Sequence, residues 1–420
     1  IYGTLENNSL GISDTKELFT LEEAMEAMFA GNAVLFVDGY DRAIKIGSRG
    51  YPGSGVQKTD SEKGLRGSKE AFSESVKMNT ALIRKRIRNA KMKAEEKQVG
   101  RYSATTTALL YLDGVVYLPI CEEMRKRLDA FEVDGIEDGG MIEYLTRKKK
   151  EGRFPVYQTT ERPDRAAQAI LEGRVVLLTD NSPEALIFPA TLNSLFQTAD
   201  DYYRNERIVT FLRLIRYVAA FLALALPGLY VAAATFHPQL LPGNLIRSMA
   251  EARSGVPFPT AAEVLLMELS FELLREAGLR MPGPAGNTIG IVGGLIVGQA
   301  AVSANLVSPI TVTVAALTAL GSFSIPNEEL SEVFRLWKYG ILLLGSCFGI
   351  LGVMLGCFLL LMLMAEQESY GIPWLYPYVG GNLNERADEK DSMFLAAARK
   401  RKRRPIFAKW GNRIRFRRKS

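Results

Sequence analysis

The sequence predicts an α/β cytoplasmic domain with a repeated α-β-β unit, followed by an α-helical transmembrane bundle. Two observations lead to this fold class. The chain has 420 residues, of which 23% are charged, yet three long stretches carry no Asp, Glu, Lys or Arg: 217–246, 281–327 and 339–365. A bilayer span needs about 20 apolar residues. The first half of the chain, in contrast, is rich in charge and contains two copies of one short pattern.

These differences divide the chain into three predicted regions. Residues 1–206 form the α/β domain, residues 207–378 form the transmembrane domain, and residues 379–420 form a basic cytoplasmic tail. The formal net charge of +6 depends on that tail, because residues 399–420 include many Lys and Arg and no acid. A tail of this kind beside a membrane favours anionic lipid as a partner over nucleic acid, and a solvated tail without a partner is the alternative.

The pattern repeated in the first region is an α-β-β unit. The segment LEEAMEAMFAGNAVLFVDGYDRAI from Leu21 aligns without gaps to PDRAAQAILEGRVVLLTDNSPEAL from Pro163, and Gly31 recurs as Gly173. Each copy predicts a helix, a glycine that ends it in the left-handed conformation, and two short strands around an Asp-centred turn. Two copies of one packing module explain the repeat. A shared ligand site is the alternative.

The second region predicts about four membrane crossings. We expect them near residues 208–236, 287–303, 310–325 and 339–365. Several Arg residues precede the first crossing, so the positive-inside rule places the α/β domain in the cytoplasm, and four crossings return the C-terminus there. Aromatic residues that flank the last crossing are expected at the membrane interface: Trp337, Tyr339, Tyr370, Trp374, Tyr376 and Tyr378.

The helix predicted for residues 261–279 is ambiguous, because it combines apolar residues with several Glu. If it crossed the membrane, the basic tail would lie outside. We therefore predict an amphipathic, non-crossing helix that lies in the interface or is buried in the bundle. Its Glu268 and Glu272 are candidates for a cation mouth, and a salt bridge with Arg275 is an equally simple interpretation.

Glycines and polar residues recur at helical spacing in the membrane region. Glycine allows helices to approach closely, and the expected packing positions are Gly286, Gly290, Gly294, Gly298, Gly345, Gly349, Gly352 and Gly356. Uncharged polar side chains at this depth either bond across helices or face a wet pathway. The candidates for lining or gating a pore are Asn287, Gln299, Asn305, Thr311, Thr313 and Thr318.

Enzymatic and metal chemistry find no support in the sequence. Three cysteines and one histidine give neither a disulfide framework nor a metal-ligand spacing. Nothing indicates a carboxylate pair beside a base of shifted pKa. We therefore expect no catalytic residues, no cofactor and no metal.

Several long stretches resemble the A subunits of GerA-type spore germinant receptors, and the resemblance covers almost the whole chain. Among them are LFVDGYDRAIKIGSRGYPG from Leu35, VGRYSATTTALLYLDGV from Val99 and GQAAVSANLVSPITVTVAALTALGSFSIPNEEL from Gly298. Stage V sporulation protein AF is similar over the same region. The resemblance also implies a further N-terminal subdomain before Ile1.

The resemblance implies a function as well. It predicts a membrane subunit of a nutrient-responsive germinant receptor in the spore inner membrane, with both termini cytoplasmic. Such a subunit oligomerises and forms or gates a cation-conducting pathway that starts germination. A transporter-like B subunit and a lipoprotein C subunit would be its partners. The alternative is a non-conducting scaffold of a sporulation or germination complex, anchored to anionic lipid by the basic tail.

Overall fold

The computed structural model describes residues 15–29, 32–39, 41–46, 62, 64, 66–148, 151–280, 284–380, 388–409, 411, 413 and 414. The chain separates into two compact units. Unit 1 contains residues 1–209 and 368–420, and unit 2 contains residues 210–367. Unit 2 is therefore inserted in the sequence of unit 1.

Unit 1 begins with a small antiparallel sheet. Its strand order is β1-β3-β2, with β1 (Thr15–Leu18), β3 (Ala43–Ile46) and β2 (Ala33–Phe36). Helix α2 (Leu21–Phe29) packs on this sheet through Ala24 and Ala27, which are buried with Leu18. A two-stranded hairpin alone is marginal in water, and the third strand and the helix give this element an apolar interior.

The main sheet of unit 1 has five antiparallel strands in the order β4-β5-β7-β8-β6. Their bounds are β4 (Met92–Val99), β5 (Thr105–Leu112), β7 (Val175–Thr179), β8 (Ala185–Phe188) and β6 (Gln158–Thr160). Every residue of β7 is buried, because this strand lies between β5 and β8 and both faces of the sheet are covered. A continuous apolar run such as VVLLT is typical of a strand in that position.

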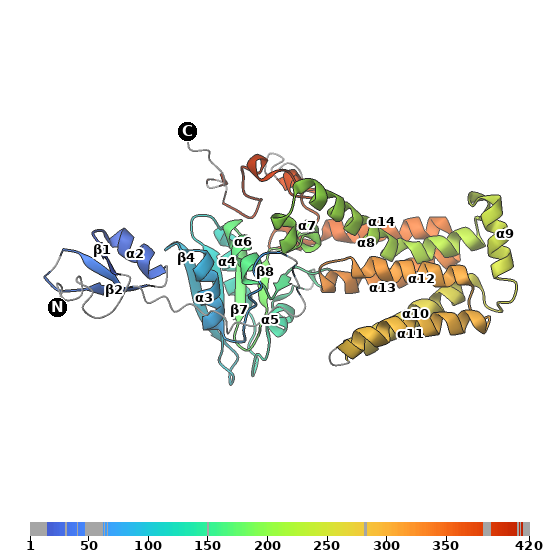
Figure 1. Ribbon diagram of the computed structural model, residues 1–420, viewed down its shortest axis with the longest axis horizontal. Helices are drawn as coiled ribbons and strands as arrows, with labels where there is room; N and C mark the ends of the chain where they lie inside the picture. Colours follow the sequence, from blue (N-terminus) through green and yellow to red (C-terminus); the bar gives the residue numbers. More distant parts are fainter. Residues whose placement is uncertain are drawn as a thin grey trace. The chain divides into compact units, whose positions relative to one another are not determined.

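Helices cover both faces of the main sheet (Figure 1). Leu110, Val176 and Ile187 share one apolar core with α3 (Val76–Arg86) and α6 (Pro163–Leu171). Leu109, Leu177 and Phe188 share the other with α4 (Leu118–Asp129) and α5 (Gly139–Thr146). Neighbouring residues of a strand thus point to opposite cores, as the pleat requires. Two short helices follow the sheet, α7 (Leu192–Phe196) and η2 (Ala199–Tyr203).

The predicted α-β-β order is confirmed in both copies. The first copy is α2 with the antiparallel pair β2 and β3, and the second is α6 with the antiparallel pair β7 and β8. Gly173 ends α6 with φ +93°, in the left-handed region that glycine tolerates. The equivalent Gly31 lies outside the described residues.

The segment after the last long helix folds onto unit 1, which corrects two of our expectations. This C-terminal segment (368–414) contains β9 (Glu368–Ser369), β10 (Ile372–Pro373), η4 (Asp388–Lys390) and η5 (Ala398–Lys400). Trp374 is fully buried, and its Nε1 donates to Pro155 O at 2.8 Å. The described part of the predicted tail 379–420 is therefore folded protein, and Trp374 is a core residue of unit 1.

Two further aromatic residues fasten the C-terminal segment. The hydroxyl of Tyr370 lies 2.6 Å from that of Tyr157, and both rings are buried beside Phe188. Phe407 is buried under the guanidinium of Arg174, whose Cζ lies 5.1 Å from the ring centroid. Tyr370 and Tyr376, expected at a membrane interface, instead belong to the core that covers one face of the main sheet.

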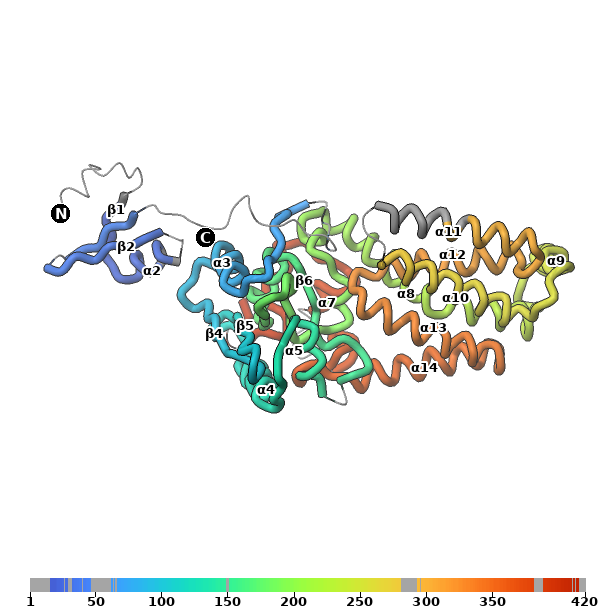
Figure 2. The backbone as a smooth tube through the Cα atoms, turned by 90° about the horizontal axis from the view of Figure 1, so that it is seen from below, coloured from blue at the N-terminus to red at the C-terminus, as the bar shows by residue number. Residues whose placement is uncertain are grey.

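Unit 2 is helical. Its long helices lie side by side in both views, and α9 crosses one end of them (Figures 1 and 2). The bounds are α8 (Glu206–Thr235), η3 (Pro238–Leu240), α9 (Gly243–Ala252), α10 (Thr260–Leu279), α11 (Pro284–Ser303), α12 (Pro309–Phe323), α13 (Glu328–Phe348) and α14 (Ile350–Glu366). Among the described residues, α8 is the one helix long and apolar enough to cross a membrane by itself. The four predicted crossings are therefore not confirmed.

The predicted single span over 339–365 is wrong, because the chain reverses inside it. Gly349, with φ +63°, ends α13 and begins α14, and the two helices pack against each other along their length. A Cβ on Gly352 would lie 1.9 Å from Leu344 O, and one on Gly356 would lie 2.9 Å from Ile341. Glycine at these positions allows the hairpin to close.

The Glu-containing helix α10 packs against other helices of unit 2 along one side. It contacts α11 and α12 and forms ion pairs with α13. The prediction that α10 does not cross a membrane stays a prediction, since α10 exposes Leu269 and Leu273 and buries Glu268 on the side that packs against its neighbours. Its acids are compatible with that position because basic residues of α13 face them.

Candidate functional site

A groove of about 600 Å³ opens between α10, α12 and α13, and we call it the charged groove. It is lined by apolar, small and charged side chains: Glu268, Phe271, Glu272, Leu274, Arg275, Gly278, Leu279, Ala316, Ala319, Leu320, Ser322, Phe323, Arg335 and Lys338. Pockets of about 300 to 1,000 Å³ are the usual size for small-molecule sites. Five charged groups meet here, three of them basic.

Two ion pairs join α10 to α13 in the groove. Lys338 Nζ lies 2.6 Å from Glu268 Oε2, and the two side chains are 6% and 2% exposed. One helical turn farther along α10, Glu272 pairs with Arg335, which also lies 3.6 Å from Glu332. Since the partners run in opposite directions along the sequence, α10 and α13 are antiparallel. The acids proposed as a cation mouth are thus neutralised in this arrangement.

Arg275 is the remaining basic residue of the groove. The predicted alternative of a salt bridge from Glu268 or Glu272 to Arg275 is not what the structure has. Arg275 instead donates to Ser322 Oγ at 2.6 Å, and its Cζ lies 4.2 Å from the centroid of the Phe323 ring. Within the described part of the chain, no carboxylate forms an ion pair with it.

A second buried acid, Glu263, holds the start of α12. It is fully buried and accepts hydrogen bonds from Ser308 N at 2.9 Å and Thr311 Oγ1 at 3.0 Å. Arg253, from the C-terminal end of α9, donates to the same carboxylate at 3.1 Å. A carboxylate at a helix N-terminus interacts favourably with the exposed N–H groups and the helix dipole. This cluster therefore ties α9, α10 and α12 together.

The predicted pore residues fall into two groups. Thr311 and Thr318 are buried, and each bonds within the bundle, Thr311 to Glu263 and Thr318 to Val314 O. Gln299, Thr313 and Asn305 are exposed on the outside of unit 2. The side chain of Asn287 lies outside the described residues. The structure therefore does not bring the candidates together within one chain.

The predicted glycine positions differ in what surrounds them. A Cβ on Gly345 would lie 2.8 Å from Val353 and 3.0 Å from Gly228 O, where α8, α13 and α14 meet. One on Gly298 would lie 3.3 Å from Val312, and one on Gly294 3.5 Å from Phe271. The surroundings of Gly286 and Gly290 lie outside the described residues.

Sequence reasoning missed the basic partners and Glu263. Arg335 and Lys338 lie three residues apart just before an uncharged run, so they occupy one face of a helix. Two acids one turn apart on α10 require such a counterpart if the helix is buried. The need of buried acids for basic partners could therefore have pointed to Arg335 and Lys338. For Glu263 the signal was weaker: the Ser-Pro pair at the start of α12 marks a helix N-terminus, where a carboxylate can bind.

The family model "Bacillus/Clostridium GerA spore germination protein" matches residues 3–407. The chain belongs to the GerA family. This family takes part in spore germination.

Individual GerA relatives match at similar levels. The membrane protein YfkQ of Bacillus subtilis (strain 168) is 37% identical over 390 residues, which cover 93% of this chain and 75% of YfkQ. Spore germination protein A1 of the same organism is 36% identical over 364 residues, covering 87% of this chain and 76% of the relative. A solved structure, the N-terminal domain of the A subunit of the Bacillus megaterium germinant receptor GerK3, is 26% identical, covers 46% of this chain and 68% of its own, and has a TM-score of 0.34.

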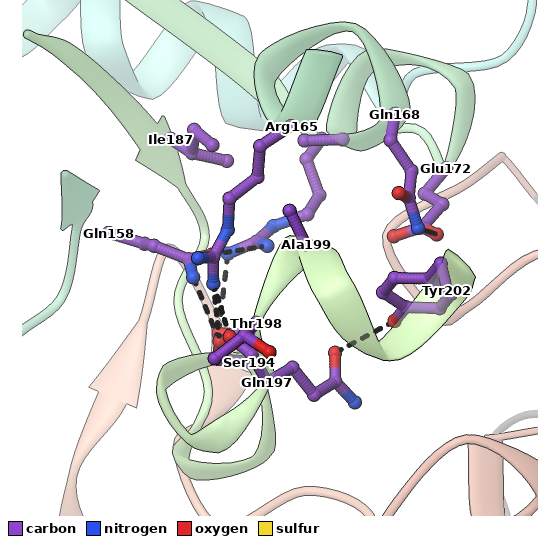
Figure 3. A pocket seen from close by; sticks show the side chains of 12 residues that line it. Gln158, Arg165, Gln168, Glu172, Ile187, Ser194, Gln197, Thr198, Ala199 and Tyr202 are labelled. Atoms are coloured by element: carbon purple, nitrogen blue, oxygen red, sulfur yellow. Dashed lines mark hydrogen bonds between the residues drawn. The ribbon is translucent and has the colours of Figure 1, made fainter. Parts of the chain in front are cut away.

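The GerA chain has a second, smaller cleft in unit 1, beside α6 and α7. Gln158 and Arg165 point toward the turn from Ser194 to Gln197 (Figure 3), and Gln158 Nε2 donates to Ser194 O at 2.8 Å. Arg174 lies beneath, where burial lowers its pKa to about 10. The cleft measures about 30 Å³, which has room for about two water molecules. Gln158, Arg165 and Arg174 already donate to backbone carbonyls around the cleft. The cleft therefore has a structural role in unit 1.

Neither metal-binding clusters nor a reactive cysteine marks another candidate site among the described residues. The described chain contains no cluster of three or more His, Cys, Asp or Glu that could hold a metal ion. Burial raises the pKa of the Cys121 thiol to about 12, so this cysteine is inert at neutral pH. The charged groove of unit 2 is therefore the strongest candidate for a functional site.

Proposed function

We propose that this chain is the membrane subunit of a nutrient-responsive spore germinant receptor, and that several copies form or gate a cation-conducting pathway that starts germination. The family supplies the link to germination. The arrangement of polar residues in unit 2 supports a pathway between copies rather than through one chain.

The observation that carries this proposal is an exposed stripe on α11. Its described exposed residues Gln299, Ala300 and Ser303 are small or polar, with Ile296 as the one large apolar exception, and Thr313 is exposed on the neighbouring α12. By contrast α14 exposes large apolar side chains, including Leu351, Phe358 and Leu361. Large apolar side chains are stable next to lipid hydrocarbon, whereas small and polar side chains are more stable next to another helix or water. The second half of α12 exposes Leu317 and Leu320 in the same way as α14. We infer that α11 and the start of α12, where Thr313 lies, face other copies and the pathway.

Glu268 and Glu272 would act as a cation mouth only in a second arrangement. Both are neutralised by bases of α13 in the structure. A cation would be attracted to them once α10 and α13 move apart, since the carboxylates would then lose their partners. Charged residues at membrane depth are expensive and usually mark such functional positions.

The partners and the location follow from the family rather than from the geometry. We propose that a transporter-like B subunit and a lipoprotein C subunit complete the receptor, that it lies in the spore inner membrane, and that both termini face the cytoplasm. The clustering of Arg213 and Arg216 near the start of α8 supports this orientation by the positive-inside rule.

The test compares cation release from spores that carry variants of this chain. Gln299→Leu and Thr313→Val, which keep the size but remove the polar groups, are expected to slow nutrient-triggered release of potassium. Leu351→Ala, on the exposed face of α14, is the control and should leave release unchanged. Unchanged release from both polar variants at normal protein level would contradict the proposed pathway.

The alternative function is a non-conducting scaffold held to anionic lipid by the basic tail. The described part of that tail argues against a free anchor, since Arg401 pairs with Asp391 at 3.0 Å and Arg413 is 7% exposed. Purified chain in vesicles decides between the two. Rubidium flux that requires Gln299 supports the pathway, and tail-dependent binding without flux supports the scaffold.

A further inference from the structure

We propose that the charged groove binds one anionic phospholipid, with its phosphate on Arg275 and an acyl chain between α10 and α12. The groove lies within unit 2, and its lining has two parts of different chemistry. One end carries the basic side chains Arg275 and Arg335, and the walls carry Phe271, Leu274 and Leu320. An anionic phospholipid has the matching two parts, a charged headgroup and an apolar acyl chain.

The charges of the groove leave one base without an acid. Glu268 neutralises Lys338, and Glu272 neutralises Arg335. Arg275 forms its described polar contact with a neutral hydroxyl, Ser322 Oγ. Partial burial of a guanidinium among apolar side chains costs desolvation free energy unless an anion pairs with it. The side chains that line the groove carry a net charge of +1, while Glu332, which also pairs with Arg335, is largely exposed and lies outside the lining. The groove therefore fits a ligand of charge −1.

Hydrogen-bond donors of the groove also remain available. The guanidinium of Arg275 has five N–H groups, of which the bond to Ser322 uses one. The Nε of Arg335 is buried and has no acceptor within the described part of the chain. Phosphate oxygens accept from guanidinium groups in a bidentate manner, which suits these donors better than a single carboxylate or halide.

The depth of Arg275 agrees with the position of a headgroup. It lies one turn before the end of α10 at Leu279, and the Phe323 ring that stacks on it is the last residue of α12. The same end of the bundle carries the start of α8 (Figures 1 and 2), and Arg213 and Arg216 lie within the first three turns of that helix. Basic pockets between helices on the cytoplasmic side are known to hold anionic headgroups.

The apolar walls extend from this end toward the middle of the helices. Ala316 and Ala319, small residues on α12, leave the space beside Phe271 and Leu274 of α10. If free inorganic phosphate bound here, the apolar walls would stay uncovered, whereas an acyl chain would pack against them. This apolar part favours a phospholipid over the free anion.

The experiment measures lipid retained by the purified full-length chain. The protein is incorporated in vesicles of phosphatidylcholine with one tenth phosphatidylglycerol, extracted in mild detergent, and the bound phosphatidylglycerol is counted by native mass spectrometry. We expect about one molecule per chain. Arg275→Gln should lower retention about fivefold, the effect of one basic group at a lipid surface. Arg280→Gln, an exposed base five residues away that pairs with Glu276, should leave retention unchanged.

A second pair of variants tests the apolar part without removing a charge. Ala316→Trp fills the groove and should displace the lipid, while Leu317→Trp, at the neighbouring exposed position, should not. Equal retention by the wild type, Arg275→Gln and Ala316→Trp overturns the proposal. Displacement of the lipid by millimolar phosphate, or a crosslink from the groove to a second copy in place of lipid, overturns it as well.

Discussion

Glu268 and Lys338 form a buried ion pair, with 2.6 Å between Oε2 and Nζ and less than a tenth of either side chain exposed. The pair connects α10 to α13, and Glu272 with Arg335 repeats the connection one turn away. Two parallel links of this kind fix the register of antiparallel helices, because a shift by one turn would place acid against acid or leave a charge unpaired.

The first prediction concerns this pair. Lys338→Met leaves the Glu268 carboxylate buried without its cation, and removal of one partner of a buried pair costs about 3–5 kcal/mol. The double variant Glu268→Gln with Lys338→Met should be more stable than Lys338→Met alone. Thermal unfolding of the full chain in detergent gives the comparison. Arg280→Gln, which breaks an exposed pair, is the control. A double variant as unstable as the sum of the single ones would contradict the prediction.

The second prediction concerns the α13–α14 hairpin. Gly352→Ala places a Cβ 1.9 Å from Leu344 O, so the helices must separate, at a cost of about 1–3 kcal/mol. Gly340→Ala is the matched control, because no atom lies within 4 Å of its added Cβ and alanine favours the helix. Unfolding midpoints of the two variants should move in opposite directions. Equal midpoints would mean that the two helices do not pack as described.

The third prediction concerns the docking of the C-terminal segment on unit 1. Gly173→Ala and Gly114→Ala both impose a side chain at positive φ, +93° and +76°. Only the first adds a clash, since its Cβ would lie 2.7 Å from Ala408 Cα, while Gly114 has open space. Gly173→Ala should therefore be less stable than Gly114→Ala by about 1–3 kcal/mol.

Limited proteolysis supplies the readout for this third prediction. Gly173→Ala should expose the chain near residue 408 to trypsin faster than Gly114→Ala does. If both variants are cut at the same rate, positive φ alone explains the loss of stability, and the contact between Gly173 and Ala408 is unimportant.

The fourth prediction concerns acid stability. Burial disfavours the charged form of Asp164, but two hydrogen bonds from Arg162 and one from Tyr203 outweigh it and hold the pKa of this carboxyl below its ordinary value of 3.8. A group with a lowered pKa stabilises the folded state above its unfolded pKa, and that stability is lost as the pH falls through the folded pKa. The stability difference between wild type and Asp164→Asn should thus shrink below about pH 4. A constant difference down to about pH 2 would contradict it.

The α/β unit was largely predictable because its signals are local. The continuous apolar run Val175–Thr179, the glycine at Gly173 and the Asp-centred turn each depend on a few neighbouring residues. Their recurrence in the first copy reinforced the interpretation. The docking of Tyr370 and Trp374 was not predictable, because aromatic residues after an apolar run are equally typical of a membrane interface.

The helical unit was harder to predict because charge-free runs do not show where a chain reverses. Residues 339–365 have the length of one span, and glycine is common in membrane helices, so Gly349 gave no break signal. The acids Glu268 and Glu272 made the placement of α10 ambiguous, because their bases on α13 are far from them in the sequence. The reversal at Gly349 adds one helix to the bundle, and the start of α8 and the end of α14 lie at the same end (Figures 1 and 2).

The insertion of unit 2 into unit 1 has a consequence for synthesis. Tyr370, Trp374 and Phe407 belong to the core of unit 1 but follow every helix of unit 2 in the sequence. A ribosome therefore releases them only after the last helix, α14, has been made. Until then the five-stranded sheet lacks part of the apolar cover on one face. The α/β unit can complete its fold only after all the helices of unit 2 have been synthesised, so a chain truncated within the helices would leave unit 1 without part of its apolar core.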